Sequence, residues 1–322
     1  MTQTSKAKAV TVVMSTYNGA ERLRETLDSM CHIKAPEGGW KLIVVDNAST
    51  DNSKEIISSF SGVLPMVALY CAKQGKNAAL NMAIPYFEGD LIIFADDDIL
   101  VPENWLLKFQ ELASLHKEYS VFGSRIVPRW PSPPGEHILQ GVSLGEAFAI
   151  HESDIPDGPV KSGKIWGPSM AVRAEIFNTG LRFDENIGPS KGSYIPGSES
   201  SFNRMLELQG HKFYFSNSLE VQHQIRPEQL TIKWLKQRAF KFGKARVFWN
   251  DFEGGTPGEK KIWIFPRWYF SYMLKAAGEY IFSLLSANKI RRMRATWNGM
   301  IGYGMITQSR AMYKEKSRKI DE

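Results

Sequence analysis

The segment Leu91-Ile92-Ile93-Phe94-Ala95-Asp96-Asp97-Asp98 joins an apolar run to three consecutive carboxylates. The apolar run shows no polar alternation, which is typical of a strand covered on both faces of a parallel sheet. Side chains at the carboxyl end of such a strand face the crevice where open α/β sheets bind ligands. Adjacent carboxylates resist ionisation unless a cation is near, and Mg²⁺ or Mn²⁺ supplies that charge alongside substrate phosphates. The alternative is a solvated acidic loop that precedes a helix with Pro102 and Glu103 near its first turn.

Strands and helices alternate through the first 127 residues. Five apolar segments are predicted to be strands: 10–14, 40–45, 66–71, 91–95 and 121–127. Amphipathic helices are expected between them, such as the one that carries Leu23, Leu27 and Met30. This alternation predicts right-handed crossovers. The predicted fold class is therefore α/β, with a Rossmann-like, mostly parallel sheet flanked by helices.

The pattern changes after residue 127. A proline-rich loop surrounds Trp130, and the stretch to residue 164 has little periodicity. Such a long unpatterned insert is usually functional or disordered. A helix is then predicted at 198–209, short strands at 212–215 and 219–223, and a further helix at 228–249. After a Gly/Pro linker at 251–258, two amphipathic basic helices are predicted at about 262–287 and 290–313.

Polar residues follow the successive predicted strands. Asp46, the segment 74–76 and the segment 96–98 each lie at a strand end, so a parallel sheet would bring them together. Asp46 could instead close its own loop as an Asx-turn, and Lys76 could be a solvated helix residue. The chain has neither G-x-x-x-x-G-K-[ST] nor G-x-G-x-x-G, so neither a P-loop nor a dinucleotide fingerprint is present.

Several motifs, taken in order, resemble those of family-2 glycosyltransferases. They are VVMSTYN at 12–18, VVDNASTD at 44–51, FADDD at 94–98, WGPSMAVR at 166–173, GSESSF at 197–202 and VQH at 221–223. The resemblance covers about residues 10–250. It implies a GT-A fold, a nucleotide-activated sugar as donor and inversion of the anomeric centre.

The resemblance also implies a catalytic base. Glu199 matches the acidic position that takes the proton of the acceptor hydroxyl, a role that typically contributes about 10²–10⁴ in rate. The family often has two adjacent acids there, whereas Glu199 is flanked by Ser198 and Ser200. Without the resemblance, Glu199 would be an ordinary first-turn glutamate capped by Ser198.

Other roles follow for the donor, the metal and the acceptor. The predicted donor-binding residues are Thr16, Tyr17, Asn18, Asp46, Lys76, Asp96, Asp97, Arg226 and Arg238. Asp98 is the predicted ligand of Mn²⁺ or Mg²⁺, with His223 either a further ligand, a contact to the diphosphate or a structural histidine. The predicted acceptor-binding residues are Trp130, Trp166 and Gly167, although both tryptophans could instead fill the core, which is the more ordinary place for Trp166.

The C-terminal region differs in charge from the rest. From Lys260 onward the sequence has 13 Lys/Arg and 4 Asp/Glu, whereas the whole chain carries +6. The two basic helices either bind an anionic membrane in its plane or pack on protein. No nucleic-acid motif accompanies them. The predicted domains are a catalytic domain at 1–250, with donor and acceptor halves at 1–127 and 128–250, and a helical region at 251–322.

Cys31 and Cys71 form no metal-ligand spacing, and residues 1–8 lack the apolar core of a signal peptide. We therefore expect a cytoplasmic protein, with any membrane-bound fraction on the inner face of the plasma membrane. Homo-oligomerisation is left open.

The sequence thus predicts a metal-dependent, inverting glycosyltransferase that passes a sugar from a nucleotide donor to a glycan or lipid-linked acceptor in surface polysaccharide or glycoconjugate synthesis. Two alternatives are a sugar-1-phosphate nucleotidyltransferase and a non-catalytic module that binds sugar nucleotides or membranes. The first would be expected to carry a Gly-rich loop after the first strand, which Ser15-Thr16-Tyr17-Asn18-Gly19 is not.

Overall fold

The structure is a computed structural model that describes residues 10–151, 155–189, 194–195, 197–252, 261–262 and 265–321. Two compact units make up the chain. Unit 1 comprises residues 1–129, 150–193 and 197–224, and unit 2 comprises residues 130–149, 194–196 and 225–322. The N-terminal residues 1–8 and most of the predicted linker at 251–258 lie outside the described residues. The predicted domain boundaries stay a prediction.

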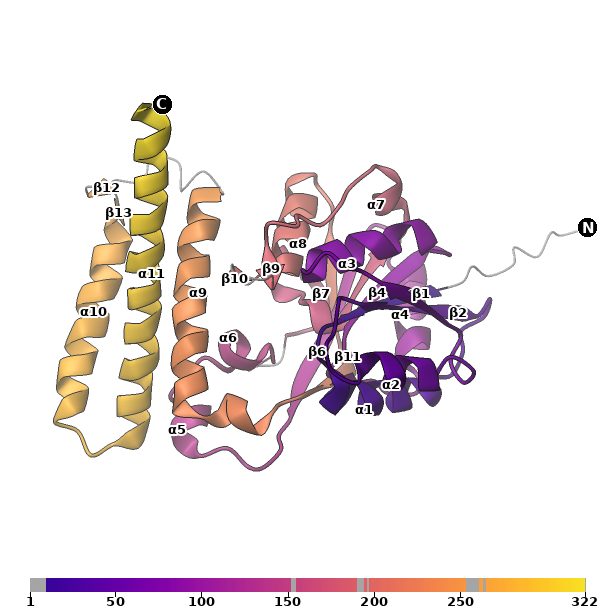
Figure 1. Ribbon diagram of the computed structural model, residues 1–322, viewed down its shortest axis with the longest axis horizontal. Helices are drawn as coiled ribbons and strands as arrows, with labels where there is room; N and C mark the ends of the chain where they lie inside the picture. Colours follow the sequence, from indigo (N-terminus) through magenta and orange to yellow (C-terminus); the bar gives the residue numbers. More distant parts are fainter. Residues whose placement is uncertain are drawn as a thin grey trace, which may run out of the picture. The chain divides into compact units, whose positions relative to one another are not determined.

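Unit 1 contains the sheet and the helices that cover it (Figure 1). Its strands are β1 (Val10–Thr16), β2 (Trp40–Asp46), β3 (Met66–Tyr70), β4 (Leu91–Asp96), β5 (Ile99–Leu100), β6 (Val121–Arg129), β7 (Gly158–Val160), β8 (Met170–Arg173), β9 (Gly188–Pro189) and β11 (Phe213–Gln224). Its helices are α1 (Ala20–Cys31), α2 (Ser53–Ser59), α3 (Lys76–Ala83), α4 (Trp105–Leu115), α7 (Glu175–Asn178) and α8 (Ser198–Leu208), with short 3₁₀ turns η1 (Ile84–Tyr86), η2 (Ser162–Lys164) and η3 (Gly167–Ser169).

The sheet has the strand order β3-β2-β1-β4-β8-β6-β11-β5, with β7 paired to β11. Strands β3, β2, β1 and β4 are parallel, as predicted. Strand β8 follows the long insert and enters antiparallel between β4 and β6. The predicted α/β class with flanking helices is therefore confirmed. The sheet as a whole is mixed, because β8 enters antiparallel between its two parallel parts and β5 and β7 pair antiparallel with β11.

Burial explains why these segments become strands. Every residue of β4 from Leu91 to Ala95 is buried, and exposure begins at Asp96. Helices α3, α7 and α8 cover one face of the sheet, where Phe94, Phe177, Phe183 and Phe202 pack together. Helices α1 and α2 lie on the other face (Figure 1). Because both faces are covered, the strands read as continuous apolar runs.

The predicted short strands at 212–215 and 219–223 are one strand, β11. Its pairing with β6 shifts register between Ser216 and Glu220. The Asn217–Ser218 interruption that divided the sequence pattern is thus accommodated as an irregularity within a continuous strand.

Unit 2 is helical. Its elements are α5 (Glu136–Leu139), α6 (Leu144–Phe148), β10 (Tyr194–Ile195), η4 (Pro227–Leu230), α9 (Ile232–Phe252), β12 (Lys261–Ile262), β13 (Phe265–Pro266), α10 (Arg267–Leu284) and α11 (Lys289–Asp321). Helix α11 packs against both α9 and α10. Gly243 and Gly304 allow the close approach of α9 and α11, since an added Cβ at either would collide with backbone of the facing helix. No helix in the described part of the chain is long and apolar enough to cross a membrane.

Candidate active site

The parallel strands end side by side, and their registers set the positions of the first site residues. Thr16 at the end of β1 pairs with Asp46 at the end of β2, and Ser15 pairs with Asp96 at the end of β4. The carboxyl ends therefore place Thr16, Asp46 and Asp96 along one edge of the sheet, as the sequence predicted for Asp46 and Asp96.

The loop after β1 is fastened to the loop after β2. Asn18 has a left-handed backbone, with φ 51°, and its side-chain oxygen accepts a hydrogen bond from the amide of Thr50 at 2.7 Å. The amide of Asn18 donates to Ser49 Oγ at 3.0 Å. Asn18 therefore holds the two loops together, whereas the neighbouring Tyr17 is exposed.

Asp97 points toward the loop after β1. Its carboxylate accepts a short hydrogen bond from the buried Thr16 hydroxyl. Burial, together with the charge of Asp98, raises the pKa of Asp97 to about 7. A carboxyl with such a pKa gains from a nearby cation, which favours its ionised form.

Buried polar residues of α1 and β11 form hydrogen bonds with the backbone of the acidic segment 96–98. The Thr26 hydroxyl of α1 donates to the carbonyl of Asp97 at 3.0 Å, and it accepts from the Gln224 side chain at 3.1 Å. The amide of Gln224 donates to the carbonyl of Asp98 at 2.8 Å. No sequence pattern indicated this arrangement, because Thr26 and Gln224 lie on elements far apart in the chain.

Asp98 and His223 face one another. Asp98 Oδ1 lies 3.3 Å from His223 Nε2, and Asp98 Oδ2 lies 3.8 Å from Arg22 Nε. Burial opposes ionisation of Asp98, but His223 and Arg22 outweigh it and lower the pKa of the carboxyl. The predicted pair of metal ligands thus comes together from β11 and the segment after β4.

Lys76 connects the predicted donor-binding residue Asp96 with the predicted base. Its ammonium, in the first turn of α3, donates to Asp96 Oδ1 at 2.6 Å and forms an ion pair with Glu199 in the first turn of α8. Burial disfavours the charge on Lys76, but the carboxylates of Asp96 and Glu199 raise its pKa. Burial likewise opposes ionisation of Glu199, and Lys76 lowers the pKa of that carboxyl. Lys76 is therefore not a solvated helix residue.

Glu199 is held against Gly167. A Cβ added at Gly167 would lie 2.6 Å from Glu199 Cδ, so only a residue without a side chain leaves room for this carboxylate. Gly19 clears space in the same way for Asp97 and Thr16. The glycines at both positions set where the acids lie.

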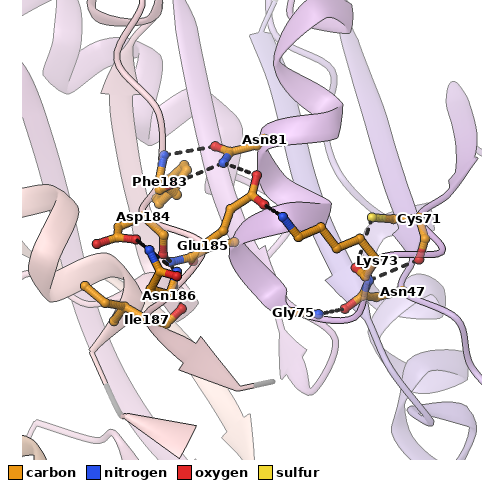
Figure 2. A network of polar contacts seen from close by, with 11 residues as sticks. Asn47, Cys71, Lys73, Gly75, Asn81, Phe183, Asp184, Glu185, Asn186 and Ile187 are labelled. Atoms are coloured by element: carbon orange, nitrogen blue, oxygen red, sulfur yellow. Dashed lines mark hydrogen bonds and ion pairs between the residues drawn. The ribbon is translucent and has the colours of Figure 1, made fainter. Parts of the chain in front are cut away.

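A network of asparagines fixes the loop before Lys76 and the helix that Lys76 begins (Figure 2). Buried Asn47 donates to the carbonyls of Cys71 and Lys73, at 3.1 and 2.7 Å, and accepts from the amide of Gly75 at 2.7 Å. Asn81 of α3 bonds to both backbone groups of Phe183, at 2.9 Å each. The segment 183–187 is also bound by the side chain of Asn77.

Asn47 was missed by sequence reasoning. The one available signal was its place directly after a strand, in a loop that leads into the predicted site. Its neighbour Asp46 accepts a hydrogen bond from the amide of Ser49 at 3.0 Å, so the Asx-turn considered for Asp46 is present.

Trp166 is partly buried and is positioned by its neighbours. It stacks on His151 with ring centroids 4.5 Å apart, and its indole nitrogen donates to the carbonyl of Gly163 at 2.9 Å. His151 accepts from the amide of Ile126 at 3.0 Å. Burial lowers the pKa of His151 to about 4.

Three predicted site residues belong to unit 2. Trp130 meets Phe148 edge to face, with ring centroids 5.1 Å apart. Arg226 pairs with Glu228 at 3.1 Å, and Arg238 donates to the carbonyl of Glu146 at 3.0 Å. The assignment of these residues to the donor or acceptor stays a prediction.

Comparison with known proteins decides the family. The profile described as "Glycosyl transferase family 2" matches residues 11–177, which is more than half of the chain. The chain belongs to this family. It is therefore a glycosyltransferase, and the family predicted from the motifs is confirmed.

Two curated relatives share the family resemblance over most of their lengths. Glycosyltransferase AglE of Haloferax volcanii is 22% identical over 247 residues, covering 76% of this chain and 75% of the relative. Succinoglycan biosynthesis protein ExoM of Rhizobium meliloti is 24% identical over 245 residues, covering 73% of each chain.

Solved glycosyltransferase structures share the fold. The mannosyltransferase PcManGT from Pyrobaculum calidifontis, solved with GDP-Man and Mn²⁺, matches with a TM-score of 0.63 at 15% identity, covering 94% of this chain and 88% of that one. TarS 1–349 of S. aureus, solved with UDP-GlcNAc, matches with a TM-score of 0.54 at 14% identity, covering 95% and 92%. The GT-A-like architecture with C-terminal helices is thus confirmed.

Proposed function

We propose that this family-2 glycosyltransferase is a metal-dependent, inverting enzyme that uses a nucleotide sugar and glycosylates a glycan or lipid-linked acceptor. The observation that carries the proposal is the meeting of Asp96, Lys76 and Glu199 in one site. The Lys76 ammonium pairs with the Asp96 carboxylate at the end of β4 and with the Glu199 carboxylate in the first turn of α8.

The donor is assigned to the edge formed by β1, β2, β4 and α3. Thr16, Asp46 and Asp96 lie at adjacent strand ends there, and Lys76 begins the helix beside them. Lys76 supplies a cation beside these strand ends, and we assign it to the anionic diphosphate. Asp46 and Asp96 are assigned to the nucleoside and the sugar.

Glu199 is assigned as the base. The acceptor hydroxyl gives its proton to the Glu199 carboxylate while its oxygen attacks the anomeric carbon from the side opposite the leaving group. The bond between that carbon and the phosphate oxygen breaks, and the nucleoside diphosphate leaves with the electron pair. Attack from the opposite side inverts the anomeric centre. The lowered pKa of Glu199 keeps the base ionised at neutral pH.

Asp98 and His223 fit a divalent cation. Two ligands at right angles on an ion with bonds of about 2.1 Å lie about 3 Å apart, close to the 3.3 Å between Asp98 Oδ1 and His223 Nε2. Within the described residues, no group of three or more His, Cys, Asp or Glu side chains could hold a metal. Two protein ligands suit Mg²⁺ or Mn²⁺, which usually complete their coordination with water and substrate phosphates. When bound, the ion would neutralise charge that develops on the leaving diphosphate.

The first experiment is a thermal-shift screen of nucleotide sugars with and without MnCl₂. GDP-mannose and UDP-N-acetylglucosamine are tested first, because the structural neighbours PcManGT and TarS were solved with them. A donor that binds only the folded protein raises its melting temperature, and at about 100 times Kd it contributes about 2.7 kcal/mol. We expect one donor to stabilise the protein, and more strongly with Mn²⁺.

The second experiment replaces Glu199 by Gln. We expect release of nucleoside diphosphate in the presence of acceptor to fall about 10²–10⁴-fold, while donor-induced stabilisation remains. Full turnover in Glu199→Gln, or a screen in which no nucleotide sugar stabilises the protein, would contradict the proposal.

A further inference from the structure

Helix α10 of unit 2 uses one face to pack on α11, which lies between α9 and α10 in Figure 1. Tyr269, Ala276 and Ser283 recur every seven residues along that face and are buried. Glu279 accepts a hydrogen bond from the Asn298 side chain of α11 at 2.9 Å. This face of α10 therefore has its partner within the chain.

The remaining surface of α10 carries large apolar residues that are exposed. Leu274 and Ile281 lie seven residues apart on α10, Phe282 lies beside Ile281, and Leu285 directly follows the last residue of α10. Phe282 is 70% exposed and Leu285 is 89% exposed. Single exposed apolar side chains are ordinary, but a contiguous group of them marks an interaction site. We call Leu274, Ile281, Phe282 and Leu285 the α10 apolar stripe.

Basic residues follow the stripe directly. Lys289, Arg291 and Arg292 open α11 and are exposed. The sequence from Tyr280 to Tyr313 contains five Lys/Arg and no Asp or Glu. The end of the α10–α11 hairpin is therefore both apolar and strongly cationic.

We propose that the α10 apolar stripe and the three cations after it bind the surface of an anionic phospholipid bilayer. The apolar side chains would enter the interfacial region, and Lys289, Arg291 and Arg292 would contact lipid phosphates. Apolar burial and attraction to anionic lipid are the two components of binding by amphipathic helices that lie in the membrane plane.

The charges favour lipid over a second copy of this chain. A second copy of this chain would supply no acidic partner for these cations, because its own hairpin from Tyr280 to Tyr313 also contains no Asp or Glu. An anionic surface instead neutralises all of them. Binding of the stripe to lipid does not depend on the proposed sugar transfer, so the experiment measures vesicle binding and not enzymatic activity.

The test is flotation of the full-length protein with vesicles of phosphatidylcholine alone or with 30% phosphatidylglycerol. We expect binding to the anionic vesicles only, weakened by 0.5 M NaCl. Ile281→Ser/Phe282→Ser/Leu285→Ser should lower the partition coefficient about 1,000-fold or more, since each of the three side chains contributes more than tenfold when buried. Arg291→Gln/Arg292→Gln should lower it about 30-fold.

The matched control is Val63→Ser/Leu115→Ser/Leu208→Ser, which removes three exposed apolar residues from unit 1. The control should bind anionic vesicles like the unmodified protein, and the far-ultraviolet spectra of all variants should agree. Equal binding to both vesicle types, or equal loss in the control, would overturn the proposal. So would a dimer that the stripe variant abolishes, seen by light scattering in a protein that does not float with vesicles.

Discussion

Lys76 and Glu199 begin two different helices, α3 and α8, and form an ion pair inside unit 1. The same ammonium donates to Asp96 at 2.6 Å, so one cation serves two carboxylates that have separate proposed roles. Each of the three side chains is less than a quarter exposed. The charge state of the proposed base therefore depends on a residue that also belongs to the donor side of the site.

Replacing Lys76 by Met tests that dependence. Burial would then act on Glu199 without the opposing cation and would raise its pKa. A base must be ionised, so activity falls as the pH drops through its pKa. We expect the acidic limb of the kcat profile to move to higher pH and donor affinity to fall about 10–100-fold. Lys76→Arg should restore part of both. An acidic limb that stays in place in Lys76→Met would contradict the ion pair's role.

Gly167→Ala tests the position of Glu199. The new Cβ would meet the end of the Glu199 side chain, which can move, so we expect a small change in stability but displacement of the carboxylate. A shift of about 1 Å in a reacting group can cost about 10² in rate. We expect kcat to fall by about that factor while donor-induced stabilisation is retained.

The control for Gly167→Ala is Gly163→Ala, because nothing lies within 4 Å of a Cβ added at Gly163. Steady-state kinetics with both variants provide the comparison. Equal rates in the two variants would show that the contact between Gly167 and Glu199 does not position the base.

Asn47→Ala tests the support of the loop before Lys76. The change leaves the carbonyls of Cys71 and Lys73 and the amide of Gly75 without the bonds that Asn47 makes (Figure 2). We expect a loss of about 3 kcal/mol or more in the free energy of unfolding, measured by denaturant titration, together with weaker donor binding. The control is Asn52→Ala, which lies at an exposed position in the loop after β2 that also contains Asn47. It should change neither the free energy of unfolding nor donor binding. A fully stable Asn47→Ala protein would contradict this prediction.

His151 predicts how stability depends on pH. Its folded-state pKa of about 4 lies below the ordinary value near 6.5, so the unfolded chain takes up the proton first as the pH falls. The protein should therefore lose about 2 kcal/mol of stability between pH 7.5 and pH 5 from this group. His151→Gln removes the titration, and its melting temperature should fall less over that range than that of the unmodified protein. An equal fall in the melting temperatures of the two proteins over this range would contradict the prediction.

The sequence predicted the strands of the first half of the fold because burial on both faces leaves a local mark. The run from Leu91 to Ala95 is apolar because helices cover both sides of β4. The same periodicity placed Asp46 and Asp96 at strand ends, and parallel pairing then brought them to one edge. Thr16 was expected in the loop after the first strand, but β1 extends to include it. Motif order was also sufficient to name the family.

The sequence alone could not place β8, because its antiparallel entry between β4 and β6 depends on how the preceding insert returns to the sheet. Nor could it show that Lys76 contacts Glu199, that Gly167 makes room for it, or that Asn47 holds the Gly75 loop. Each of these contacts joins residues that are distant in the chain. Local periodicity determines which segments become strands and helices, whereas contacts of this kind arise only when strand register and helix packing bring those segments together.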